Sequence, residues 1–186
     1  MKLSTDFTFP LIVLMTFVEL FDFVTARPAM PQGKNDLRVL YQDMRKLFNI
    51  VSQEKHENKL NDFEQPLTSL PSLDFRTEDL KTLEVSSTLE QLYSGLKSFK
   101  FHLDWIQHEQ DKLDIDYSKT KNSHLINLID RVLKQIETPI SELVHPSLPQ
   151  LKTAWNLKQA NLEIKDKLYY FCHWYIRALL GLKPKQ

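Results

Sequence analysis

The stretch from Trp155 to Leu182 reads WNLKQANLEIKDKLYYFCHWYIRALLGL, with no proline and no glycine before Gly181. Apolar residues recur in it at steps of three, four and seven, as on one face of an amphipathic helix. This apolar stripe consists of Leu157, Ile164, Leu168, Phe171, Tyr175, Ala178, Leu179 and Leu182. At about 1.5 Å per residue the helix would be roughly 40 Å long. Such a helix needs partners of similar length to cover its apolar face.

The second half of this helix carries more aromatic side chains than one buried stripe can hold. Its aromatic residues are Tyr169, Tyr170, Phe171, Trp174 and Tyr175. One interpretation is a thick core helix. The other is that part of the surplus faces a protein partner, because Tyr and Trp are frequent at interface hot spots.

Three earlier segments carry the same helical period. Their predicted bounds are Asn35 to about Glu57, Ser86 or Ser87 to about Gln110, and Asn122 or Ser123 to Pro139. We expect Asn35 or Asp36 to cap the first and Pro139 to kink or end the third. A short helical turn, capped by Thr77, is expected between the first two.

The lengths of the links between helices favour one topology. A parallel neighbour needs a connection as long as the bundle, which takes roughly ten residues or more. The first link is long, the middle link is short, and the last link, from His145 to Trp155, is just long enough if extended. The prediction is an all-α, long-chain four-helix bundle, up-up-down-down, with long first and last crossovers. An up-down-up-down order stays open.

Residues 1–26 have the features of a secretory signal peptide. Lys2 precedes an apolar run, Phe7 to Val18, and small residues precede Arg27. A membrane anchor is the alternative, but the run is shorter than the ~20 apolar residues that a membrane span needs. We therefore expect a signal peptide at 1–26, a four-helix domain at 27–186, secretion to the extracellular space and no membrane insertion.

Composition and motif spacing argue against catalysis. Lysine and arginine number 24, as do aspartate and glutamate, which gives no electrostatic reason to expect nucleic-acid binding. The six histidines are scattered without metal-ligand spacing, and neither a phosphate loop nor a nucleophile motif is present. We expect no enzyme, no cofactor and no metal. Cys172 is the single cysteine, so no internal disulfide can form, and we expect a buried free thiol.

Surface recognition is the function that these exclusions leave. Trp155 stands at the start of the last helix, where it could pack back on the helix or stay exposed as an anchor for a partner. Trp105 adjoins a stripe residue and is expected to be core or half-buried. Arg177 lies among apolar residues, either as a solvated side chain or as a recognition residue.

Several runs of the sequence resemble the interleukin-11 family of cytokines. LPSLDFRTEDLKTL (Leu70–Leu83) and LEQLYSGLKSFKFHLDWI (Leu89–Ile106) are similar to that family's first loop and second helix. TAW (Thr153–Trp155) and HWYIRALLGL (His173–Leu182) are similar to the start and end of its last helix. The resemblance covers almost the whole chain after the predicted signal peptide, and it suggests a divergent, non-mammalian form.

The resemblance implies a long-chain cytokine of the interleukin-6 class, monomeric before receptor assembly. Such a ligand binds the interleukin-11 receptor alpha chain and then glycoprotein 130, and so triggers JAK–STAT signalling. Arg177 matches a receptor-contacting arginine of the alpha-receptor surface. Arg131 matches the basic signal-transducer surface on the first and third helices, and Lys134 stands near a family arginine there. Trp155 matches the tryptophan anchor of a third surface, which favours its exposure.

The chain departs from the mammalian pattern in ways that bear on receptor matching. Mammalian members are strongly basic, whereas this chain is formally neutral. They carry an acid directly before the tryptophan of the last helix, where this chain has His173. The alternatives are another interleukin-6-class cytokine, such as a leukaemia-inhibitory-factor-like ligand, which usually carries disulfides, and a secreted helical lipid carrier.

Overall fold

The computed structural model describes residues 33–57, 66–71, 74, 76–115, 119–136 and 146–182. All of them belong to one compact unit, Gly33–Gln186. The predicted signal peptide at residues 1–26 and the predicted domain start at residue 27 lie outside the described residues. Both stay predictions.

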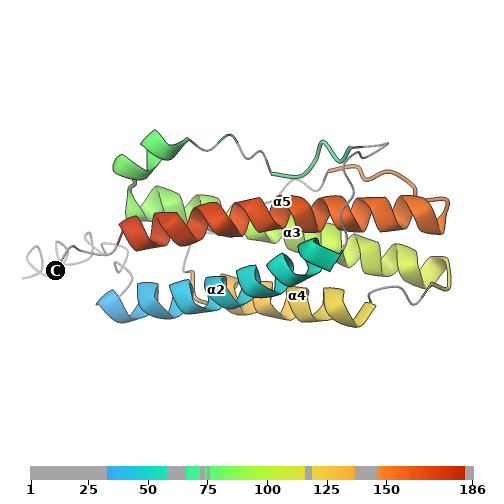
Figure 1. The fold of residues 1–186 in the computed structure, drawn as a ribbon, viewed down its shortest axis with the longest axis horizontal. Helices are drawn as coiled ribbons and strands as arrows, with labels where there is room; N and C mark the ends of the chain where they lie inside the picture. The colour runs from blue at the N-terminus through green and yellow to red at the C-terminus, as the bar shows by residue number, and fades with distance from the viewer. Residues whose placement is uncertain are drawn as a thin grey trace, which may run out of the picture. The chain divides into compact units, whose positions relative to one another are not determined.

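Four long helices are described in this unit: α2 (Gly33–Glu57), α3 (Val85–Lys112), α4 (Lys119–Leu133) and α5 (Ala154–Gly181) (Figure 1). A short 3₁₀ helix, η1 (Thr77–Lys81), precedes α3, and no strand occurs among the described residues. In Figure 1, α2 and α3 run in one direction, and α4 and α5 run back in the opposite one. The predicted all-α, up-up-down-down four-helix bundle is confirmed.

Each helix packs against antiparallel neighbours. Helix α2 lies against α4 and α5, and α3 lies against the same two helices. The parallel pairs, α2 with α3 and α4 with α5, therefore occupy the diagonals of the bundle. All four helices contribute fully buried side chains to one core, among them Met44, Leu47, Leu92, Phe99, Leu125, Ile129, Leu168 and Phe171. Removal of this apolar surface from water is the main force that holds the bundle together.

Helix α5 forms where the apolar stripe predicted it. Every stripe residue is buried except Leu182, which is partly buried against the core. The helix begins at Ala154, one residue before the expected start. Its N-cap is Thr153, whose hydroxyl oxygen accepts a hydrogen bond from the backbone N–H of Asn156 at 3.1 Å. This bond satisfies one of the backbone donors that a helix start leaves free.

Three of the predicted boundaries are wrong. Helix α2 begins at Gly33, so Asn35 and Asp36 lie inside its first turn and do not cap it. Helix α4 begins at Lys119, so Asn122 and Ser123 lie inside it, and it ends at Leu133, well before Pro139. The turn after Leu133 is tightened by a bond from the Ile136 N–H to the Leu133 carbonyl at 3.2 Å, which takes the chain out of the helix. Pro139 itself lies outside the described residues.

The start of η1 also differs from the prediction. Arg76, not Thr77, occupies the cap position. The Asp79 carboxylate accepts a hydrogen bond from the backbone N–H of Arg76 at 2.8 Å and so closes the turn. A carboxylate three residues into a helix is a common device for holding the chain at its start.

We expect Gly95→Ala in α3 to destabilise the bundle by about 1–2 kcal/mol. A Cβ at this position would overlap the edge of the Phe171 ring of α5. Overpacking of this kind costs ~1–3 kcal/mol, which exceeds the ~1 kcal/mol that alanine gains over glycine in a helix. Denaturant unfolding measures the change. Gly181→Ala is the control, because a Cβ there makes only ordinary contacts with Leu83 and Leu80. The stability of this variant should be unchanged or higher.

Candidate functional site

Trp155 lies exposed in the first turn of α5. Its side chain is 48% exposed, which agrees with the expectation that it does not pack into the core. Lys158, one turn further along, places its ammonium group 5.9 Å from the centre of the indole ring. Because Thr153 caps the helix, the indole is not needed to fix its start. A large aromatic side chain in this setting is available to a partner.

Arg131 lies where the end of α4 packs against α2, and Lys134 directly follows the last residue of α4; we call this region the α2–α4 surface. Asp43 of α2 is buried at its centre, 3.6 Å from Arg131 and 2.9 Å from Lys46, and it accepts a hydrogen bond from Gln135 at 2.7 Å. Burial would raise the pKa of Asp43, but these bonds and the positive charge of Arg131 and Lys46 outweigh it and lower the pKa. Arg131, Lys46 and Lys134 are all exposed, and the first two lie beside the buried carboxylate.

Arg177 lies near the end of α5 and is exposed. The 3₁₀ helix η1 packs against α5 at this end of the bundle (Figure 1), where the side chains of Leu80 and Leu83 lie partly buried. Leu180 is 45% exposed and is one of the few large apolar side chains that the bundle leaves uncovered. We call the group of Arg177, Leu180 and η1 the α5–η1 surface.

The structure does not bring the predicted residues together into a single site. Trp155 and Arg177 are twenty-two residues apart on α5, which separates them by about 33 Å along the helix axis. Arg131 belongs to α4 and Lys134 follows its last residue, and α4 does not pack against α5 in the described part of the chain. The predicted residues thus lie at three separate places on one bundle.

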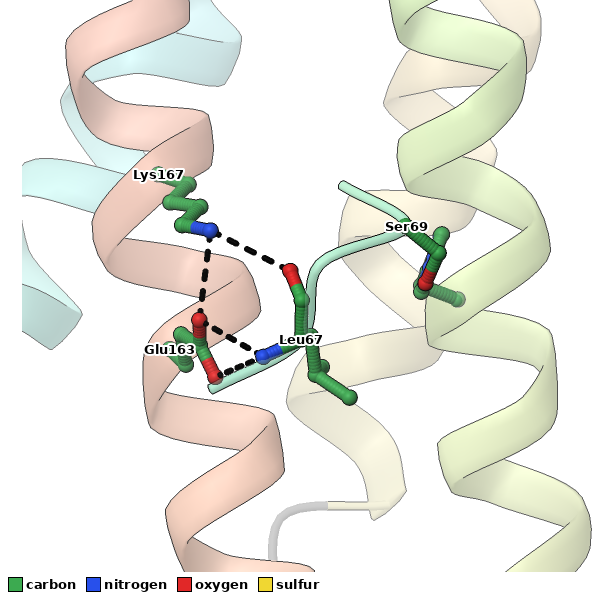
Figure 2. A network of polar contacts seen from close by, with 5 residues as sticks. Leu67, Ser69, Glu163 and Lys167 are labelled. Atoms are coloured by element: carbon green, nitrogen blue, oxygen red, sulfur yellow. Dashed lines mark hydrogen bonds and ion pairs between the residues drawn. The ribbon is translucent and has the colours of Figure 1, made fainter. Parts of the chain in front are cut away.

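A buried polar cluster holds the first crossover against α5, and we call it the crossover clasp (Figure 2). The backbone N–H of Leu67 donates to both carboxylate oxygens of Glu163, each at 3.0 Å. Lys167, one turn later, donates to the Leu67 carbonyl at 3.2 Å and lies 3.2 Å from Glu163 Oε1. The Glu163 side chain is only 3% exposed.

The other side of the clasp is His102 of α3. Its Nδ1 lies 2.8 Å from the Ser98 carbonyl, which can only accept, so Nδ1 carries the hydrogen. In the neutral ring, Nε2 then accepts from the Ser69 hydroxyl, also at 2.8 Å. Burial lowers the pKa of His102, and the nearby charge of Lys167 acts in the same direction. The crossover is thus fixed by side chains from two helices.

Metal-binding groups are not assembled in the part of the chain that the structure describes. No cluster of His, Cys, Asp and Glu there could hold a metal ion, and no described helix is long and apolar enough to cross a membrane. Cys172 is a buried free thiol, as predicted, and burial raises its pKa well above the usual range. A thiol of this kind is a poor nucleophile.

Comparison with known protein families gives a match over most of the chain. The sequence model described as Interleukin 11 matches residues 26–186. The chain belongs to the interleukin 11 family. A search of curated proteins found no match.

Interleukin 11 is a family of cytokines rather than enzymes, and membership implies cytokine receptors as partners. The match also separates this chain from the leukaemia-inhibitory-factor-like alternative. The resemblance described above places Trp155, Arg131, Lys134 and Arg177 on this family's receptor surfaces, and all four are exposed in the bundle.

Sequence reasoning missed the polar groups that organise these surfaces. Asp43 orders the basic residues of the α2–α4 surface, and Glu163 and Lys167 hold the crossover. The sequence holds one local signal for the clasp: Glu163 and Lys167 are four residues apart and flank the apolar stripe of α5. Charged residues at such positions are generally solvated, so the pattern alone does not single them out.

Proposed function

We propose that this protein is a secreted cytokine that brings receptor chains together without catalysis or cofactor. It binds the interleukin-11 receptor alpha chain first and glycoprotein 130 second, and the assembly triggers JAK–STAT signalling. The ligand is a monomer before it meets its receptors. The observation that carries this proposal is the separation of three exposed surfaces on one bundle in a chain of the interleukin 11 family.

The α5–η1 surface is proposed to bind the alpha receptor. It combines an exposed arginine, Arg177, with an uncovered apolar side chain, Leu180, beside a short loop helix. Arginine and neighbouring apolar contacts are typical of interface hot spots. Exposure rather than burial of Arg177 supports its role as a recognition residue.

The other two surfaces are proposed to bind two copies of the transducer. The α2–α4 surface presents Arg131 and Lys134 and would attract an acidic patch on its partner. The ion pair with Asp43 limits the orientations open to the Arg131 guanidinium. Trp155, at the far end of α5 from Arg177, supplies the aromatic anchor of the third surface.

The first experiment is a binding measurement on the secreted, mature chain. The immobilised alpha-receptor ectodomain of the same species should bind the chain, and adding the glycoprotein 130 ectodomain should give a larger complex. Binding to the transducer alone would point to another cytokine of the same class. A well-folded helical chain that binds neither receptor would contradict the proposal.

We expect Arg177→Ala to weaken alpha-receptor binding by about 1 kcal/mol or more, which is about fivefold or more in Kd. The loss should appear mainly in the dissociation rate, because a contact is removed from the bound complex. Surface plasmon resonance measures both rates. Lys152→Ala is the matched control: it removes one exposed positive charge just before α5, at the opposite end of that helix from Arg177, and should leave both rates unchanged. Unchanged binding by Arg177→Ala would remove this residue from the surface.

A further inference from the structure

On the α5 side, the crossover clasp recognises backbone rather than side chains. Glu163 and Lys167 contact the N–H and the carbonyl of the same residue, Leu67, as Figure 2 shows. They therefore fix the position of the crossover along the axis of α5, and this does not depend on which side chains the crossover carries. On the α3 side, Ser69 contacts His102, and the side chains of Leu67 and Leu70 are 4% and 6% exposed. The crossover is pinned at this one place from two helices.

The burial of Glu163 would be costly without the crossover. A carboxylate only 3% exposed needs hydrogen bonds and a counter-charge to offset its loss of water. The Leu67 N–H supplies the hydrogen bonds, and Lys167 supplies the charge. Glu163 thus favours the docked crossover over any arrangement in which Leu67 moves away.

The clasp lies directly upstream of η1 in the sequence and shortens its tether. From Leu67 to Thr77, where η1 begins, the chain has ten residues; from Glu57, the end of α2, it has twenty. The clasp therefore halves the length of chain between η1 and the nearest fixed point on its N-terminal side. On its C-terminal side only residues 82–84 separate η1 from α3. With the clasp η1 is held from both ends, and without it η1 is held closely only from the α3 end.

Helix η1 depends on these two attachments because its own packing against the bundle is weak. It has only five residues, and none of them is fully buried. Leu80 and Leu83 contribute partly buried contacts at the end of α5. The fraction of time that such a segment spends docked depends on how closely the neighbouring chain is held to the bundle.

We propose that Glu163, Lys167 and His102 are positioning residues for the alpha-receptor surface: they hold η1 against the end of α5 that carries Arg177, without touching the receptor. The inference rests on the function proposed above for the α5–η1 surface. It predicts a specific kinetic signature. When only a fraction of the ligand is competent to bind, the apparent affinity falls by that fraction. The loss then appears in the association rate, whereas loss of a direct contact, as in Arg177→Ala, appears in the dissociation rate.

The test uses Glu163→Gln in the full mature chain. The amide has nearly the same shape but cannot accept the Leu67 N–H and pair with Lys167 as the carboxylate does. The association rate with the alpha-receptor ectodomain should fall about twofold or more, as when half of the ligand is not competent to bind, with the dissociation rate unchanged. Asp166→Asn is the matched control: it removes a carboxylate three residues away that pairs with Lys55 on the α2 side, and it should change neither rate.

Hydrogen exchange of single amides separates the possible outcomes. In Glu163→Gln the amides of Leu67 and Leu80 should exchange faster, while the core of α5 stays protected. Faster exchange at Leu67 with an unchanged association rate would overturn the inference. If the wild-type chain binds no alpha receptor, the proposed function fails, and the Leu80 amide alone decides: unchanged exchange there would overturn the positioning role.

A milder variant covers the case in which Glu163→Gln loses helical structure. Ser69→Ala removes the contact with His102 from the crossover side and leaves all four helices intact. It should also lower the association rate and speed exchange at Leu80. If the helices are intact and neither changes, the inference is wrong.

Discussion

Replacing Lys165 with methionine is expected to lower the free energy of unfolding by about 3–5 kcal/mol. Lys165 of α5 and Glu54 of α2 form an ion pair with 2.5 Å between Nζ and Oε2, and their side chains are only 6% and 8% exposed. Methionine fills the space of the lysine without its charge, so Glu54 is left as a buried carboxylate that has lost its counter-charge. Denaturant unfolding followed by circular dichroism measures the loss.

Two further variants test whether burial of Glu54 is the cause. The double variant Glu54→Met with Lys165→Met should recover most of the lost stability, because no charge is then left buried. Lys55→Met breaks a neighbouring α2–α5 pair, with Asp166, that is much more exposed and should cost only about 0–1 kcal/mol. A loss below about 1 kcal/mol for Lys165→Met would show that water reaches Glu54 and would contradict the prediction.

The fold could be predicted because its determinants repeat along the chain. On α5, residues such as Leu157, Leu168 and Ala178 keep the same helical face over the whole helix, and all three are buried. The long first link, from α2 to α3, allows those helices to be parallel, which favours the observed topology without excluding the up-down-up-down order. Helix ends were predicted less well because single residues decide them. Asn35 and Asp36 are good caps in isolation, yet the helix begins before them at Gly33.

The clasp and the buried ion pairs could not be predicted because their partners are distant in sequence. Glu163 is buried only because the backbone of Leu67, ninety-six positions earlier, returns to meet it. Lys165 likewise needs Glu54 of another helix. Within α5 alone, both residues lie among charged neighbours such as Asp166 and are typical of a solvated face. The position of Trp155 at the start of α5 left its exposure open, and only the family resemblance favoured it.

Trp155→Ala is expected to abolish most signalling while leaving the fold intact. Its indole is 48% exposed, and Thr153 caps α5 without its help, so truncation should leave stability within about 0.5–1 kcal/mol of the wild type. As the aromatic anchor of an interface it should be worth about 2 kcal/mol or more, which is roughly thirtyfold in transducer affinity. Binding to the alpha receptor should survive, because Arg177 lies about 33 Å away along α5.

A STAT reporter in cells that carry both receptors measures the signalling, and circular dichroism with thermal unfolding measures the fold. Tyr170→Ala is the matched control: Tyr170 is 50% exposed on the same helix and belongs to none of the three proposed surfaces. If Tyr170→Ala lowers signalling as much as Trp155→Ala, exposed aromatic area on α5 matters in general and the indole is no specific anchor. If Trp155→Ala instead unfolds the bundle, the indole is part of the core. Loss of signalling with alpha-receptor binding retained is the outcome that only a separate transducer surface explains.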